Sequence, residues 1–300
     1  MKCLFHTFLR RKASLVLVFS LVWYAGPIRA MILTDEAGRR VVIPDRSERI
    51  VSLAPSITEI VFALGAGNRL VGITQFSNYP PEAKRIAKVG SYVHLNIEKI
   101  LALRPDLVIG IKDGNPRAVV ERLSELGVPA FIINPKSLDE ILVTIRNIGK
   151  VIGADECATS LSNQMARRMS EVDRKVQGAP KPRVFFQIGI EPIVSAGRGT
   201  FIDALIQRAG GLNVFGGKSA YPHVNIEHVL ISRPEIIFIS SMARQGGFEK
   251  VRQFWQEWPD IPAVKKDNIY IIDSDILDRP SPRIIEGLET LARLIHPERF

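Results

Sequence analysis

The chain has 300 residues, long enough for two domains that each bury a core, and its 46% hydrophobic and 24% charged content is that of a soluble globular protein. The formal net charge of +9 points at first to a nucleic-acid partner, but five of the basic residues lie in the first thirty positions, which contain no acidic residue. No basic run follows them, so we expect no nucleic-acid binding.

Residues 1–30 have the pattern of a signal peptide. A short basic stretch precedes an apolar run over 13–26, which is too short to span a membrane comfortably. Ala30 ends an imperfect cleavage site, because Ile28 is larger than the usual small residue. We expect export to the periplasm, with an uncleaved anchor as the alternative. Cys157 would then be the only cysteine of the mature chain, which excludes an intrachain disulfide.

The first part of the mature chain, residues 31–153, alternates short apolar segments with helical ones. A hairpin turn at Gly38 is followed by a buried strand and then by a helix that begins near Ser56. Ser56 and Glu59 have the spacing of a capping box, so we expect Glu59 to cap this helix instead of acting as a catalytic acid. The alternation of strands and helices predicts a doubly wound α/β lobe.

One stretch occurs twice, over residues 92–111 and 221–240, at a constant offset of 129 and without a gap. In each copy an Asn is the predicted N-cap of a short helix, a Glu falls in the first turn, and an Arg-Pro pair ends the helix. The apolar run that follows predicts a central strand of a parallel sheet. The repeat therefore predicts two lobes of similar build, related by a pseudo-two-fold axis.

Between the lobes, residues 154–178 form a predicted linker helix. Positions 155–177 contain neither Gly nor Pro, and apolar residues recur there at three- and four-residue steps. At ~1.5 Å per residue such a helix is roughly 34 Å long, which makes it a stiff connector and limits hinge closure. The second lobe, residues 179–300, repeats the alternation of strands and helices and ends in a helix from about Pro282 to Ile295.

The loop Asp273–Arg283 follows the last predicted strand. In open α/β sheets ligands bind at the carboxyl ends of strands, which places Asp275, Asp278 and Arg279 for ligand contact. Solvated loop charges are the alternative.

Taken together, these segments resemble the solute-binding proteins of bacterial importers for metal chelates, and among them the members that carry cobalamin (vitamin B12). The resemblance is carried, in order along both lobes, by RIVSLAPSITEIVFALG, SNYPPEAKRI, NIEKILALRPDLVI, RVFFQIGIEP, NIEHVL and DRPSPRI. It implies two Rossmann-like lobes with doubly wound sheets, joined by a single long α-helix, with a ligand cleft between the lobes.

The resemblance also assigns ligand contacts, which fall on Phe76, Tyr92, Tyr221, Asp275 and Arg279. A corrinoid is a broad disc with apolar faces and amide-rich edges, so aromatic rings can cover its faces while a few polar groups orient it. Ile111 and Ile276 stand where the cobalamin carriers have tryptophans, so a related corrinoid or another chelate remains an alternative ligand.

Glu98 and Glu227 receive a second role from the resemblance. The equivalent glutamates of the family, one per lobe, dock onto arginines of the two subunits of an ABC transporter permease, which works with an ATPase. Two equivalent carboxylates on two similar lobes suit a symmetric dimeric partner. The alternative is a first-turn carboxylate that only stabilises the helix dipole. We expect the carrier itself to be a monomer.

His94 and His223 occupy matched positions beside the predicted cleft, where an imidazole could be an axial ligand of haem iron or cobalt. Polar rim histidines are the favoured alternative. The chain has no GxSxG, P-loop or metal-hydrolase motif, so we expect no enzyme activity and no resident cofactor, with cobalamin as cargo. A siderophore- or haem-binding protein of an iron-chelate importer is the second hypothesis, and a sensor that uses the same fold is the third.

Overall fold

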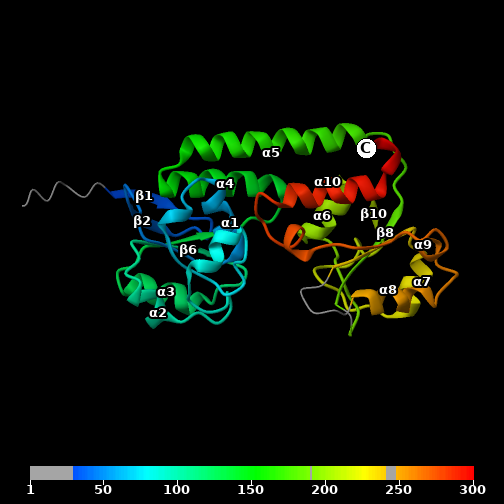
Figure 1. Cartoon of the computed structure of the whole chain (residues 1–300), viewed down its shortest axis with the longest axis horizontal. Coiled ribbons are helices and arrows are strands. Elements are labelled where there is room, and N and C mark those ends of the chain that lie inside the picture. Colours follow the sequence, from blue (N-terminus) through cyan, green and yellow to red (C-terminus); the bar gives the residue numbers. More distant parts are fainter. Residues whose placement is uncertain (1–29, 190, 241–247) are drawn as a thin grey trace, which may run out of the picture.

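The computed structural model describes residues 30–189, 191–240 and 248–300, and the signal peptide predicted over residues 1–30 lies outside these ranges except for its last residue. Two α/β lobes lie next to each other, and the long helix α5 (Asp155–Val176) runs along both (Figure 1). This confirms the predicted fold class. No helix in the described ranges is long and apolar enough to cross a membrane.

Lobe 1 is built on a parallel five-stranded sheet of order β5-β4-β3-β6-β7. Its strands are β3 (Ile50–Ser52), β4 (Leu70–Ile73), β5 (Ala87–Lys88), β6 (Leu107–Ile111) and β7 (Ala130–Ile133), and its helices are α1 (Pro55–Ala63), α2 (Ile97–Ala102), α3 (Arg117–Glu125) and α4 (Leu138–Ile152). Leu107 and Ile109 of β6 face the core beneath α1 and α4, whereas Val108 faces the core beneath α2 and α3. The central strand is therefore covered on both faces, as a continuous apolar run requires. An antiparallel hairpin of β1 (Ala30–Thr34) and β2 (Arg40–Pro44) precedes this sheet.

Lobe 2 is built on a second sheet, of order β10-β8-β11-β12, in which these four strands are parallel and β9 pairs antiparallel with β8. Its strands are β8 (Arg183–Gly189), β9 (Val194–Ser195), β10 (Leu212–Asn213), β11 (Ile236–Ile239) and β12 (Ile269–Ile271), and its helices are α6 (Phe201–Arg208), α7 (Ile226–Ser232), α8 (Phe248–Gln256), α9 (Pro262–Lys265) and α10 (Ile284–Ile295). Helices α6 and α10 cover the face nearer α5, and α7, α8 and α9 cover the other.

The two copies of the repeat fold alike. Asn96 Oδ1 accepts a hydrogen bond from the Lys99 amide at 2.7 Å, and Asn225 Oδ1 accepts one from the His228 amide at 2.9 Å, so both predicted N-caps are confirmed. After each helix the arginine before the proline has φ of 46°, outside the right-handed region that a following proline disfavours. Each copy then enters a central strand of its sheet, β6 or β11.

The capping box predicted for Ser56 and Glu59 is wrong. Helix α1 begins at Pro55 with Ala54 as its N-cap, and no side chain caps it. Proline has a fixed φ and no amide hydrogen to satisfy, so it is well suited to the first helical position and starts the helix one residue earlier. Glu59 then lies one turn into the helix and is buried, with 3% of its surface exposed.

The hydrophobic core differs from the expectation of two separate cores. The largest cluster of buried side chains is continuous from α1 and α4 of lobe 1, through α5, to α6 and α10 of lobe 2. Helix α5 packs on both α4 and α10 and contributes Met165, Met169 and Val172 to this cluster (Figure 1). The lobes are therefore joined by shared apolar packing as well as by the chain.

We predict that Met169→Ala, which leaves a cavity at a side chain that is 1% exposed, lowers the free energy of unfolding by about 2–5 kcal/mol. Because the core is continuous, calorimetry should show one cooperative transition at a lower temperature. Gln164→Ala, at an exposed position on the same helix, is the control and should change stability by less than about 0.5 kcal/mol. Two separated transitions in the Met169 variant would contradict a shared core.

Candidate functional site

Loops at the carboxyl ends of the two sheets contact each other. The loop after β4 carries Phe76 and Asn78, and the loop after β12 carries Asp275 and Arg279. Asn78 Nδ2 donates to Asp275 Oδ2 at 3.1 Å, and Arg279 Nη1 donates to Asn78 Oδ1 at 2.9 Å. Ligands of open α/β sheets bind at such edges, so this meeting of loops from both lobes is the candidate site.

A chain of buried hydroxyl groups holds the loop that presents Phe76. Thr58 Oγ1 of α1 lies 2.9 Å from Ser52 Oγ of β3 and 3.1 Å from Ser77 Oγ. Ser77 Oγ in turn lies 2.9 Å from Thr74 Oγ1. All four side chains are buried and hydrogen-bonded, so the backbone on either side of Phe76 is fixed while its ring stays 43% exposed.

Asn115, which the sequence analysis did not single out, positions Tyr92. This buried amide donates to the carbonyls of Leu53 and Tyr92 at 2.9 and 2.8 Å and accepts from the Ile111 amide at 2.7 Å. Next to it Gly114 has φ of +137°, and a Cβ there would lie 2.7 Å from Cδ2 of the Tyr92 ring. Glycine is therefore required for the ring to take its half-buried position.

Tyr221 lies on the lobe 2 side of the site and is 55% exposed. Its loop is held by backbone hydrogen bonds, from Ser195 N to the Pro222 carbonyl at 3.0 Å and from Gly197 N to the Ala220 carbonyl at 2.7 Å. Partial burial of the hydroxyl and the negative charges of Asp278 and, from lobe 1, Asp113 raise the pKa of Tyr221. The hydroxyl of Tyr221 is thus in the electrostatic field of both lobes.

Asp275 and Arg279 lie inside a buried polar cluster that joins the lobes. Arg279 is 11% exposed and donates to Glu59 Oε1 at 2.8 Å and to Asp275 Oδ1 at 2.6 Å. Glu59 also accepts from Ser281 Oγ at 2.6 Å. We call this group the inter-lobe cluster; its members are Glu59, Asn78, Asp275, Arg279, Ser281 and Arg283. The two predicted ligand residues Asp275 and Arg279 are thus both part of this cluster. Sequence reasoning missed Asn78 and Ser281 and took Glu59 for a helix cap, because their partners lie about 200 positions away.

Asp278 lies beside this cluster and is the most perturbed acid of the site. Among the described residues none gives a hydrogen bond to its buried Oδ1 atom. Burial, together with the negative charges of Asp275 and Asp273 and against the opposing charge of Arg279, raises the pKa of Asp278 to about 7.

The remaining predicted residues lie outside the inter-lobe cluster. His94 and His223 are exposed, and the described residues contain no group of three or more His, Cys, Asp or Glu side chains that could hold a metal ion. Glu98 and Glu227 are exposed on the first turns of α2 and α7. Ile111 and Ile276 are half-buried and pack against the continuous core.

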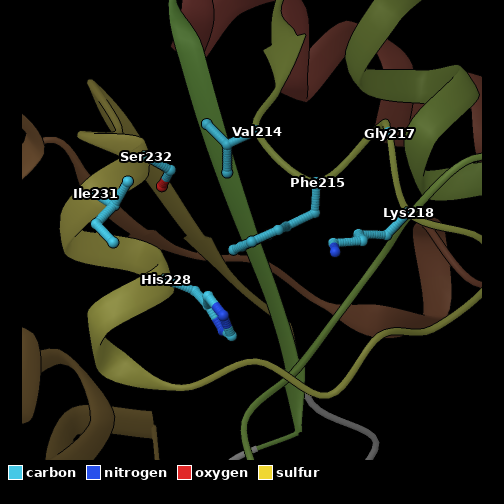
Figure 2. A pocket seen from close by; sticks show the side chains of 7 residues that line it. All are labelled: Val214, Phe215, Gly217, Lys218, His228, Ile231 and Ser232. Atoms are coloured by element: carbon cyan, nitrogen blue, oxygen red, sulfur yellow. The ribbon is translucent and has the colours of Figure 1, made fainter.

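A separate hollow of about 370 Å³ lies beside α7 in lobe 2 and contains none of the predicted ligand residues. Figure 2 shows His228, Ile231 and Ser232 of α7 on one side of it and the segment after β10 on the other. Ile231 is 80% exposed. The hollow therefore borders the helix that carries Glu227, not the meeting edges of the sheets.

Residues 50–276 match the family model described as periplasmic binding protein. The chain belongs to this family. The vitamin B12-binding protein of Vibrio vulnificus (strain CMCP6) is 33% identical over 279 residues, which cover 92% of this chain and 93% of the relative. The family resemblance found in the sequence is thereby confirmed.

Two solved structures with the same fold belong to proteins named for two different ligands. The periplasmic vitamin B12 binding protein BtuF of Vibrio cholerae superposes with a TM-score of 0.74 at 31% identity, covering 84% of this chain and 97% of that one. The periplasmic heme-binding protein RhuT of Roseiflexus sp. RS-1 gives 0.75 at 29% identity, covering 85% and 100%. The fold is thus shared by carriers of cobalamin and of haem.

We predict that Asp278→Asn stabilises the protein at pH 8 by about 1–4 kcal/mol and has little effect near pH 4. The folded-state pKa of Asp278 is above its ordinary value of 3.8, so the folded protein keeps a proton that the unfolded chain loses. The resulting cost to stability grows as pH rises from about 4 and is complete above about 7. Urea unfolding at several pH values measures it.

The control is Asp260→Asn, at a carboxylate that is 96% exposed, and it should leave the pH dependence unchanged. An Asp278→Asn variant that is less stable than the parent by the same amount at every pH would contradict a buried, unpartnered acid.

Proposed function

We propose that this chain is a periplasmic solute-binding protein, exported by the signal peptide in residues 1–30, that captures cobalamin or a related corrinoid between its lobes and delivers it to the permease dimer of an ABC transporter. The observation that carries the proposal is the contact between loops of both lobes at the carboxyl ends of the two sheets. Phe76, Tyr92 and Tyr221 follow strands β4, β5 and β10 at these ends. The cobalamin carriers among its relatives support it, since one matches more than nine-tenths of both chains.

The chemistry of the site suits such a ligand. Two of the three aromatic rings keep a large exposed surface, 43% for Phe76 and 55% for Tyr221, so a broad apolar disc can bury them without moving the core. The cluster of carboxylates, amides and guanidinium groups beside them can accept or donate hydrogen bonds to amide side chains at the edge of a corrinoid. Ile111 and Ile276 leave the site with less aromatic surface than two tryptophans would.

Haem is the second candidate, because a heme-binding protein superposes on this chain as well as the cobalamin carrier does. The exposed imidazoles of His94 and His223, at matched positions in the two lobes, are the residues that could coordinate its iron. A siderophore is less well supported, because anionic iron complexes call for several basic groups, whereas Arg279 already faces Glu59 and Asp275.

We predict one-to-one binding in calorimetric titrations of the purified protein with cyanocobalamin and with cobinamide, and weaker binding or none with haem. Tyr221→Ala should weaken corrinoid binding by about 10- to 100-fold, because a ring that becomes buried by the ligand is worth about 1.5–3 kcal/mol. Phe300→Ala, at an aromatic side chain that is 37% exposed near the C-terminus, is the control and should bind normally. Binding of haem alone would replace the corrinoid proposal by its alternative.

For delivery, we propose that Glu98 and Glu227 contact basic residues of the two permease subunits. Both carboxylates are exposed at equivalent positions of the repeat, on helices with the same N-cap. On lobe 2 the exposed Ile231 and the hollow of Figure 2 adjoin Glu227 and add apolar surface to the same face.

We predict that the double variant Glu98→Ala with Glu227→Ala binds ligand with unchanged affinity but loses ligand uptake in cells that depend on this carrier. The matched control is Glu125→Ala with Glu249→Ala, which removes one exposed glutamate per lobe elsewhere. Uptake that survives in the Glu98/Glu227 variant would show that these carboxylates are only first-turn residues, whose loss costs each helix about 0.3–1 kcal/mol.

A further inference from the structure

The carboxylate of Glu59 has an unusual set of partners, because it belongs to lobe 1 and all of them belong to lobe 2. Oε2 accepts from Ser281 Oγ at 2.6 Å, Oε1 accepts from Arg279 Nη1 at 2.8 Å, and Arg283 Nη1 lies 3.7 Å from Oε1. The Glu59 side chain is 2% exposed. A buried carboxylate needs such partners, so its hydrogen bonding is satisfied only while lobe 2 stays in place.

Arg279 shows the reciprocal arrangement. Its two Nη atoms donate four hydrogen bonds, and three of them reach lobe 1: to Glu59, to Asn78 Oδ1 at 2.9 Å and to the Phe76 carbonyl at 3.4 Å. The fourth goes to Asp275 in its own loop. The guanidinium group that the resemblance assigns to the ligand is thus committed to the opposite lobe, including the backbone of the proposed ligand residue Phe76.

A third contact links the same segments. The guanidinium carbon of Arg283 lies 4.2 Å from the centre of the Tyr79 ring, a cation–π distance between the loop of lobe 2 and the loop of lobe 1. The loop Asp273–Arg283 therefore belongs to lobe 2 by sequence, but its side chains also bond across to α1 and to the loop after β4.

These contacts lie at the meeting edges of the sheets, beside the continuous core, whereas α5 joins the lobes by a separate path (Figure 1). Two connections at different places resist rotation of one lobe against the other more strongly than a single helix does. The distance between Tyr221 on one side and Phe76 and Tyr92 on the other then depends on the inter-lobe cluster.

We propose that Glu59 is a positioning residue: it anchors the loop Asp273–Arg283 of lobe 2 to lobe 1 and thereby sets the spacing of the two lobes at the ligand site. The consequence for ligand binding rests on the proposed function, but the anchoring itself does not. Glu59 orients Arg279 and Asp275 and holds the lobes in register before any ligand arrives.

The test is Glu59→Gln, which keeps the size of the side chain and removes its charge. Hydrogen–deuterium exchange followed by mass spectrometry should show amides of residues 273–283 exchanging about tenfold faster or more, since one partner of a buried charged pair has been neutralised. Arg279→Gln should have a similar effect, and the double variant should exchange no faster than the worse single variant, because the two residues act through one contact.

The matched control is Asp35→Asn. Asp35 is a buried carboxylate paired with Arg39 at 2.7 Å, but both residues lie within lobe 1. It should lower global stability without accelerating exchange in residues 273–283 beyond the rest of the chain. Equal acceleration in the Asp35 and Glu59 variants would reduce Glu59 to a general stabilising residue and overturn the proposal.

Distances between two spin labels measure the lobe spacing. The labels are attached at Ala102→Cys and Ile231→Cys, which are exposed and equivalent positions of the repeat. The background substitution Cys157→Ser removes the exposed native thiol. Glu59→Gln should broaden a narrow distance distribution, and an unchanged distribution would also overturn the proposal. If neither corrinoid nor haem binds while Glu59→Gln still frees the loop, the proposed function fails and the anchor stands.

Discussion

The buried carboxylate of Glu59 is the constraint on which the site depends. An ionised carboxylate cannot stay in an apolar interior unless charged or hydrogen-bonding partners surround it, and here each partner is supplied by the other lobe. Burial raises the pKa of Glu59, and the contacts with Ser281 and Arg279 oppose that rise. The two lobes therefore satisfy each other's polar groups at the edge where a ligand would bind.

The rest of the molecule provides a rigid frame for this contact. Helix α5 contributes apolar side chains to a core that is continuous through both lobes, so the lobes cannot separate without exposing apolar surface to water. Within lobe 1 the hydroxyl chain from Ser52 to Thr74 and the amide of Asn115 hold the loops that carry Phe76 and Tyr92. A preorganised pair of aromatic surfaces loses little conformational entropy when a rigid disc binds.

The repeat gives the two lobes the same local build but not the same surface. Helices α2 and α7 share their N-cap and their first-turn glutamate, which suits a symmetric partner. At another exposed position of the repeat they differ, since Ile231 stands where lobe 1 has Ala102, and the hollow beside α7 is lined by residues of lobe 2 alone. In the proposed docking, the two permease subunits would contact equivalent glutamates surrounded by different side chains.

Most of the fold was predictable from the sequence, because local rules determine it. Apolar runs predicted the central strands, the repeat predicted matching lobes, and Asn96 and Asn225 predicted helix starts, all of which depend on residues a few positions apart. The proposed ligand residues were found through their place after strands and through a resemblance, and their roles stay predictions.

The role of Glu59 was misjudged, since a capping pattern at Ser56 is a local signal, whereas its partners Arg279 and Ser281 lie 220 and 222 residues away. Only the tertiary structure decided the pairing of Glu59 with Arg279 and Ser281, because folding brings the two lobes together and buries a carboxylate that needs charged or hydrogen-bonding partners.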